Sequence, residues 1–261
     1  MRERCAAWWL AIRIDAASSN ALATRPTALV TFVVSPALSV VFLVSLSSAM
    51  GSADIVTTAY AAVLINSVLV VTLAMATSMT RDRQLGLIHE TLGRCVYRLR
   101  FWIPRAIVPS GATCVSTTAT VGCILALDPH HQIHVAVACL TLLPVAMAVG
   151  MGLGVFCSGL ALTMRDPYLV ANLVSGLLVL TSGVVAPLAS YPRWAYLVCR
   201  YLPGSGMVAA LRSAADGHWD CFVGGIACDV VGAIVVASTG IGGAVVALSA
   251  VRRGRRPIDA F

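Results

Sequence analysis

Long apolar segments constrain this 261-residue chain more than any other feature. A helix of roughly 20 apolar residues matches the hydrocarbon thickness of a bilayer. Hydrophobic residues make up 59% of the chain and charged residues only 11%, a balance far from that of soluble domains. The predicted spans cover residues 27–50, 55–79, 106–127, 133–164, 168–189 and 222–251. We therefore expect one all-α transmembrane domain over residues 1–261, with six membrane-spanning helices.

The arginines predict how these helices are oriented. All 18 basic residues are arginine, and placing the N-terminus in the cytoplasm leaves 15 of them on the cytoplasmic side and three outside. The three outside are Arg193, Arg200 and Arg212. Cytoplasmic loops hold the excess of positive charge, so we expect both termini in the cytoplasm and the chain in the plasma membrane. No signal peptide is evident, because the first apolar run lacks a clean cleavage site.

The segments outside the spans have distinct patterns. Residues 1–26 carry a short apolar stripe with two tryptophans, which is typical of an interfacial helix or of a polar lead-in. Residues 80–104 repeat apolar side chains every three to four positions among arginines, which predicts one or two cytoplasmic amphipathic helices. Residues 190–220 are rich in aromatic residues and prolines, which favours short external, re-entrant helices at the headgroup layer. Residues 252–261 form a basic cytoplasmic tail.

Familiar catalytic and ligand-binding signatures are missing from the sequence. Without lysine there is no phosphate-loop lysine, and no HExxH or GxSxG motif occurs. The net charge of +7 does not indicate nucleic-acid binding, because the arginines lie between apolar runs. His130, His131 and His134 cluster in one loop, but a solvated loop is a better interpretation than a metal site. We expect no catalytic residues and no bound metal.

Asp229 and the cysteines are the remaining polar candidates. Asp229 is the one ionisable residue well inside a predicted span, where a charge costs about 3 kcal/mol. It is a candidate for the substrate path, although a carboxylate near the interface more often pairs with a neighbour. The nine cysteines are scattered, mostly within apolar runs. Cys199 and Cys221 both fall near the outer face, so a disulfide between them stays open as a minor alternative.

Two motifs resemble those of the ABC type-2 exporter permeases, including the membrane subunits of antibiotic- and daunorubicin-resistance exporters. The first follows the second span and contains Arg81, Asp82, Arg83, Leu85, Gly86, Ile88, Glu90 and Leu92. The second precedes the last span and contains Gly183, Pro187, Pro192, Trp194, Pro203 and Arg212. The resemblance implies that the first segment docks on an ATPase subunit and that the second forms external helices.

The resemblance also implies the partners of the chain. It implies an ATP-driven exporter in which ATP and Mg²⁺ bind to a separate ATPase, so that this chain itself carries no cofactor. A second permease, identical or related, and membrane lipid would be the other partners, and no nucleic acid is expected. The cargo stays open, because an apolar path suits drugs, antibiotics, lipids and lipid-linked glycans alike.

Other functional classes remain as alternatives at this point. An ATP-independent secondary carrier or channel is the main one, although such proteins usually show internal repeats or more intramembrane acids. A membrane-embedded transferase or a structural scaffold is a further alternative. Co-purification with an ATPase would separate the exporter from all of these.

Overall fold

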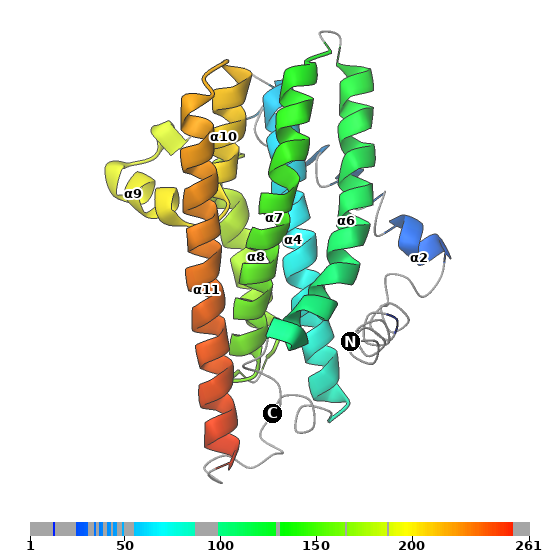
Figure 1. Ribbon diagram of the computed structural model, residues 1–261, viewed down its shortest axis with the longest axis vertical. Coiled ribbons are helices and arrows are strands. Elements are labelled where there is room, and N and C mark those ends of the chain that lie inside the picture. Colours follow the sequence, from blue (N-terminus) through cyan, green and yellow to red (C-terminus); the bar gives the residue numbers. More distant parts are fainter. Residues whose placement is uncertain are drawn as a thin grey trace, which may run out of the picture.

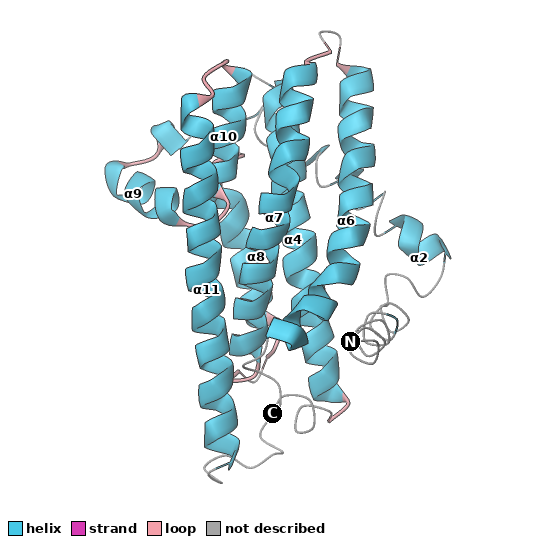
Figure 2. Cartoon of the chain, in the orientation of Figure 1, coloured by secondary structure: helices cyan, strands magenta, loops and turns pink. Residues whose placement is uncertain are grey.

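The protein is a bundle of helices in the computed structural model, which describes residues 55–86, 99–128, 131–164, 166–186 and 188–252, with isolated residues and one short helix before residue 50. No strand occurs in these described parts (Figure 2). The helices are α2 (Arg25–Leu29), α4 (Ile55–Gln84), α6 (Leu99–Leu127), α7 (Ile133–Ala161), α8 (Leu169–Thr181), η3 (Leu188–Ser190), α9 (Arg193–Tyr201), α10 (Ser205–Ala215) and α11 (Asp220–Arg252). The prediction of an all-helical chain is confirmed for these residues.

Four of the helices are long and apolar enough to cross a bilayer. These candidate spans are Ile55–Gln84, Trp102–Leu127, Ile133–Ala161 and Phe222–Val246, and they correspond to the second, third, fourth and sixth predicted spans. They run side by side along the long axis of the bundle (Figure 1). Most of the first predicted span and of segment 1–26 lies outside the described residues, so the count of six spans stays a prediction.

The structure differs from the prediction at residues 80–104, between the second and third predicted spans. α4 continues to Gln84 and α6 already begins at Leu99, so both ends of this region belong to the long helices. Hydropathy fell at Arg81, but backbone hydrogen bonding along a helix does not require apolar side chains. Pro104 and Pro109 lie inside α6. Residues 87–98, where the amphipathic helix was predicted, lie outside the described residues.

The fifth apolar segment forms a shorter helix than predicted. α8 has 13 residues, which is too short to cross the hydrocarbon core by itself. It ends because Gly183 adopts a left-handed backbone with φ +78° directly after the cap residue Ser182, a common way to stop a helix. The chain then continues through η3, α9 and α10, which are short helices as predicted for residues 190–220.

α7 is the central helix, packed mainly between α4 and α11. Glycines allow this close approach, as expected for small residues between membrane helices. A Cβ on Gly150 would lie 2.9 Å from Val71 Cβ on α4, and a Cβ on Gly159 would overlap the carbonyl oxygen of Gly240 on α11. Glycine at Gly150, Gly159 and Gly240 therefore lets α7 pack closely on α4 and α11, whereas Gly242 meets no neighbour within 4 Å.

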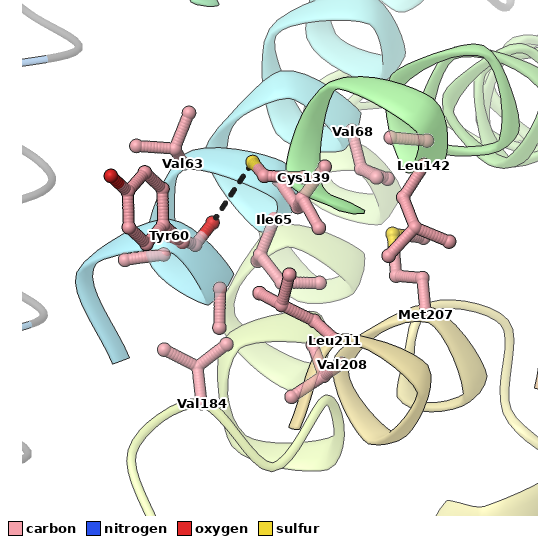
Figure 3. Close-up of a cluster of buried hydrophobic side chains, with 14 of the residues drawn as sticks. Tyr60, Val63, Ile65, Val68, Cys139, Leu142, Val184, Met207, Val208 and Leu211 are labelled. Carbon is pink, nitrogen blue, oxygen red and sulfur yellow. Dashed lines mark hydrogen bonds between the residues drawn. The ribbon is translucent and has the colours of Figure 1, made fainter. Parts of the chain in front are cut away.

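The larger core lies where α4, α7 and α10 meet. Figure 3 shows Ile65, Leu142 and Leu211, one from each helix, gathered in one cluster of buried side chains. The thiol of Cys139 also lies 3.8 Å from the backbone oxygen of Tyr60 across α7 and α4 (Figure 3). Burial of apolar side chains against one another therefore fixes α10 to the long helices, although α10 is too short to span the membrane.

Candidate functional site

An ion pair joins α4 to α6 at the end of the bundle from which residues 87–98 emerge. Asp82 lies in the last turn of α4, and its Oδ2 accepts a hydrogen bond from Nη2 of Arg105 on α6. The two side chains keep only 12% and 15% of their accessible area, respectively, so the pair is better shielded from solvent than an ordinary surface pair. Nη1 of Arg105 also lies 3.4 Å from Met79 Sδ.

Arg83 joins α4 to a third helix. Its Nη1 donates hydrogen bonds to the carbonyl oxygens of Ala161, at 2.8 Å, and Met164, at 2.9 Å. Ala161 is the last residue of α7, where carbonyl groups lack partners within the helix. A cation at this position also complements the negative end of the helix dipole. Adjacent residues of α4 therefore hold α6 on one side and α7 on the other.

A cluster of apolar side chains supports these polar contacts. Met79, Trp102 and Leu162 are buried together, and they come from α4, from α6 and from the turn after α7. Ala244 of α11 belongs to the same cluster. We call the set Asp82, Arg83 and Arg105, with the carbonyl oxygens of Ala161 and Met164 that Arg83 contacts, the brace. It holds the ends of α4, α6 and α7 together, and α4 is followed in the chain by the rest of the segment predicted to dock on an ATPase.

The other predicted docking residues take different positions. Leu85 is exposed just beyond α4, and Gly86 ends that helix with a left-handed backbone of φ +70° and open space around it. The left-handed conformation gives Gly86 a reason of its own for being glycine. Arg81 is partly buried. Ile88, Glu90 and Leu92 lie outside the described residues.

The second predicted motif lies at the opposite end of the bundle, around α8 to α11. Gly183 ends α8, Pro192 precedes the first residue of α9, and Pro203 lies against Gly232 of α11. Trp194 is exposed on α9, and Arg212 lies in the last turn of α10. Pro187 is outside the described residues. The structure therefore places these residues along one connection between α8 and α11, without gathering them into one cluster.

Asp229 anchors α10 to α11. Its carboxylate is only 1% exposed, and it accepts hydrogen bonds from the backbone N–H groups of Gly204, Gly206 and Met207 at 2.9, 3.1 and 2.6 Å. These donors surround the first turn of α10, where N–H groups have no partner within the helix and the dipole favours a negative charge. Asp229 therefore pairs with backbone groups, which is the alternative to a substrate-path role that the sequence left open.

Glycines bring the same two helices into close contact. A Cβ on Gly206 would overlap the carbonyl oxygen of Gly225, and a Cβ on Gly225 would overlap that of Gly206. Only glycine at both positions allows the backbones of α10 and α11 to approach this closely. This pair was not predicted from the sequence. The available signal was Gly225, one helical turn before the intramembrane carboxylate of Asp229.

Tyr191 holds the connection after α8 in place. Its hydroxyl group donates a hydrogen bond of 2.8 Å to the carbonyl oxygen of Leu180. Burial raises the pKa of the Tyr191 phenol above its ordinary value, and the nearby Cys199 thiol has a smaller effect in the same direction. The phenol therefore stays a neutral donor at physiological pH.

Cys199 and His131 are cysteine and histidine candidates whose contacts the structure describes. Cys199 is a free, buried thiol on α9, and the side chain of Cys221, its possible disulfide partner, lies outside the described ones. His131 lies 3.0 Å, by its Nδ1, from the carbonyl oxygen of Leu125, and His130 is outside the described residues. No group of metal-binding side chains occurs in the part of the chain that the structure describes.

The sequence of the chain matches the family model "ABC-2 type transporter" over residues 15–215. The chain belongs to the ABC-2 type transporter family. No curated protein and no solved structure matches it significantly. The match includes α4 to α10 and therefore both the brace and the first turn of α10. It confirms the predicted resemblance to ABC type-2 permeases, and it makes the chain the membrane component of a transporter.

Proposed function

We propose that this ABC-2 permease is the membrane-spanning subunit of an exporter powered by a separate ATPase subunit. The observation that carries the proposal is the family match over residues 15–215, because ABC-2 permeases normally work with an ATPase subunit. The cargo would be a hydrophobic or amphipathic molecule, such as a drug, an antibiotic, a lipid or a lipid-linked glycan. ATP and Mg²⁺ would bind to the partner and not to this chain.

Residues 85–98 would be the surface that docks on the ATPase. This segment connects α4 to α6, and the brace holds the ends of both helices together with α7. A displacement of the segment during ATP hydrolysis would therefore act on three helices at once. Glycine contacts between α7 and α11 would pass the displacement on to the last span. In this proposal Asp82 and Arg83 transmit movement within the permease, while Leu85, Ile88, Glu90 and Leu92 contact the ATPase.

Two permeases, identical or related, would enclose the transport path in the plasma membrane. The excess of arginine on one side supports cytoplasmic termini, so the brace would be cytoplasmic and α9 and α10 external. In a cysteine-free background, a cysteine at Gln132 should react with an impermeant thiol reagent in intact cells, whereas a cysteine at Gln84 should not. Labelling at Gln84 from outside would contradict this orientation.

The experiment that tests the function is purification of the tagged, full-length permease from its native membranes. We expect an ATPase subunit to co-purify in stoichiometric amount and to hydrolyse ATP in the complex. The permease separated from that subunit should show no saturable ATP hydrolysis. The proposal would be contradicted if no ATPase co-purified and the reconstituted chain alone carried out transport driven by an ion gradient. That result would favour a secondary carrier.

A further inference from the structure

α9 has two different exposed surfaces side by side. Trp194, Leu197, Val198 and Tyr201 follow one another at the helical spacing i, i+3, i+4 and i+7, and all four are exposed. Trp194 and Tyr201 keep 73% and 72% of their accessible area. On the opposite side of the helix Cys199 is buried. The apolar side chains therefore form one continuous face directed away from the protein.

Two arginines border this apolar face. Arg193 and Arg200 are seven residues apart, so they point in nearly the same direction, about 10 Å apart along the helix axis. Both are exposed. Neither side chain has a hydrogen bond or an ion pair with any residue that the structure describes. Their charges therefore have no partner on the described protein surface.

The position of α9 fits a helix that lies along a membrane surface. With nine residues it is far too short to span a bilayer. It projects from the side of the bundle, next to α10 and α11 (Figure 1). Membrane-surface helices bury an apolar face, often with tryptophan, at the boundary between headgroups and acyl chains, while arginines stay at headgroup depth.

We propose that α9 binds anionic phospholipids, with Arg193 and Arg200 each pairing with a lipid phosphate while Trp194, Leu197, Val198 and Tyr201 rest on the acyl chains beneath. Guanidinium groups bind phosphate through two parallel hydrogen bonds, which favours the anionic headgroup over water. A zwitterionic headgroup also offers a phosphate, but its own cation offsets the attraction. This proposal needs only membrane insertion of the chain and does not depend on ATP-driven export.

The test uses the full-length chain in lipid nanodiscs of phosphatidylcholine that contain a low, equal fraction of brominated phosphatidylglycerol or brominated phosphatidylcholine. Bromine quenches nearby tryptophan fluorescence, and the difference between the native chain and a Trp194→Phe variant isolates the signal of Trp194. We expect the anionic brominated lipid to quench Trp194 more strongly. Each arginine near an anionic surface should enrich the anionic lipid by roughly fivefold.

Variants of the two arginines identify the cause of that preference. The double variant Arg193→Gln with Arg200→Gln should quench equally with both lipids, whereas Arg193→Lys with Arg200→Lys should keep most of the preference because the charge remains. Equal quenching of the native chain by both lipids would overturn the proposal. So would a preference that survives in the glutamine variant, or an absence of quenching by either lipid.

Discussion

The brace and the junction of α10 with α11 are held together by different kinds of contact. At the brace, the arginines Arg83 and Arg105 reach across gaps between helices to a carboxylate and to backbone carbonyl oxygens. At the α10 end, the short side chain of Asp229 binds backbone N–H groups directly, and Gly206 and Gly225 bring two backbones into contact. The brace thus joins α4 to α6 and α7 through flexible side chains, whereas α10 is joined to α11 through backbone groups.

This difference indicates where the permease is able to move. An arginine side chain has several rotatable bonds, so its hydrogen bonds survive small shifts of the helices that it joins. Glycine-to-glycine backbone contact leaves no such freedom, because close-packed groups resist small displacements. We therefore expect the contacts of the brace to persist while its helices shift, so that the brace transmits movement. The junction of α10 with α11 should instead behave as a rigid unit. The predictions below test this contrast.

Replacing Asp229 should have the largest effect on stability. Asp229→Ala would leave three buried N–H groups at the first turn of α10 without an acceptor, which should cost about 3 kcal/mol of unfolding free energy. Asp229→Asn should cost less, because its carbonyl oxygen still accepts a hydrogen bond. Some cost remains, because its amide NH2 group would face a backbone N–H donor. Unfolding of the purified permease in mixed detergent micelles measures both.

A matched control lies at the other end of α10. Asp216, the cap residue after Ala215, is exposed, so Asp216→Asn should leave the unfolding free energy nearly unchanged. Equal losses for Asp229→Asn and Asp216→Asn would show that the buried carboxylate has no special structural role.

Adding a methyl group to the glycine contact should have the next largest effect. Gly206→Ala would force the backbone of α10 away from Gly225, and overpacking of this kind should cost about 2 kcal/mol. Gly224 has open space around it, so Gly224→Ala is the control and should be neutral. Thermal unfolding in detergent that is identical for the two variants would contradict the close packing of α10 on α11.

Removing the arginine contact to α7 should affect stability least. Arg83→Met keeps most of the apolar stem but loses both hydrogen bonds, to Ala161 at the end of α7 and to Met164 in the turn after it. This loss should cost about 1 kcal/mol at this partly exposed position. The neighbouring Gln84→Met variant is the control, since Gln84 is exposed. A loss for Arg83→Met as large as that for Asp229→Ala would remove the contrast between the two ends.

The long spans were predictable from sequence because bilayer thickness imposes a length and a composition that hydropathy reads directly. The boundaries were less predictable. α4 continues through Arg81 because a helix does not stop where its side chains become charged. α8 stops at Thr181 although Val184, Val185 and Ala186 remain apolar. The signal for that stop, Gly183 after Ser182, is present in the sequence, but hydropathy alone does not register it.

The partners of polar residues could not be predicted in the same way. Asp82 and Arg105 were both visible as charges, but their pairing depends on how α4 and α6 pack. Likewise, the N–H donors of Asp229 lie more than 20 residues earlier in the chain. Hydropathy describes each helix against lipid and carries no information on which faces of two helices meet.

The measurement that tests the role of the brace most directly is a charge swap between α4 and α6. Asp82→Arg, Arg105→Asp and the double variant would each be purified with the co-purifying ATPase, and the ATP turnover of the complexes compared. If Asp82 and Arg105 act on each other, each single variant loses turnover and the double variant recovers most of it. A double variant as inactive as the single ones, or single variants that match the native complex, would contradict the brace.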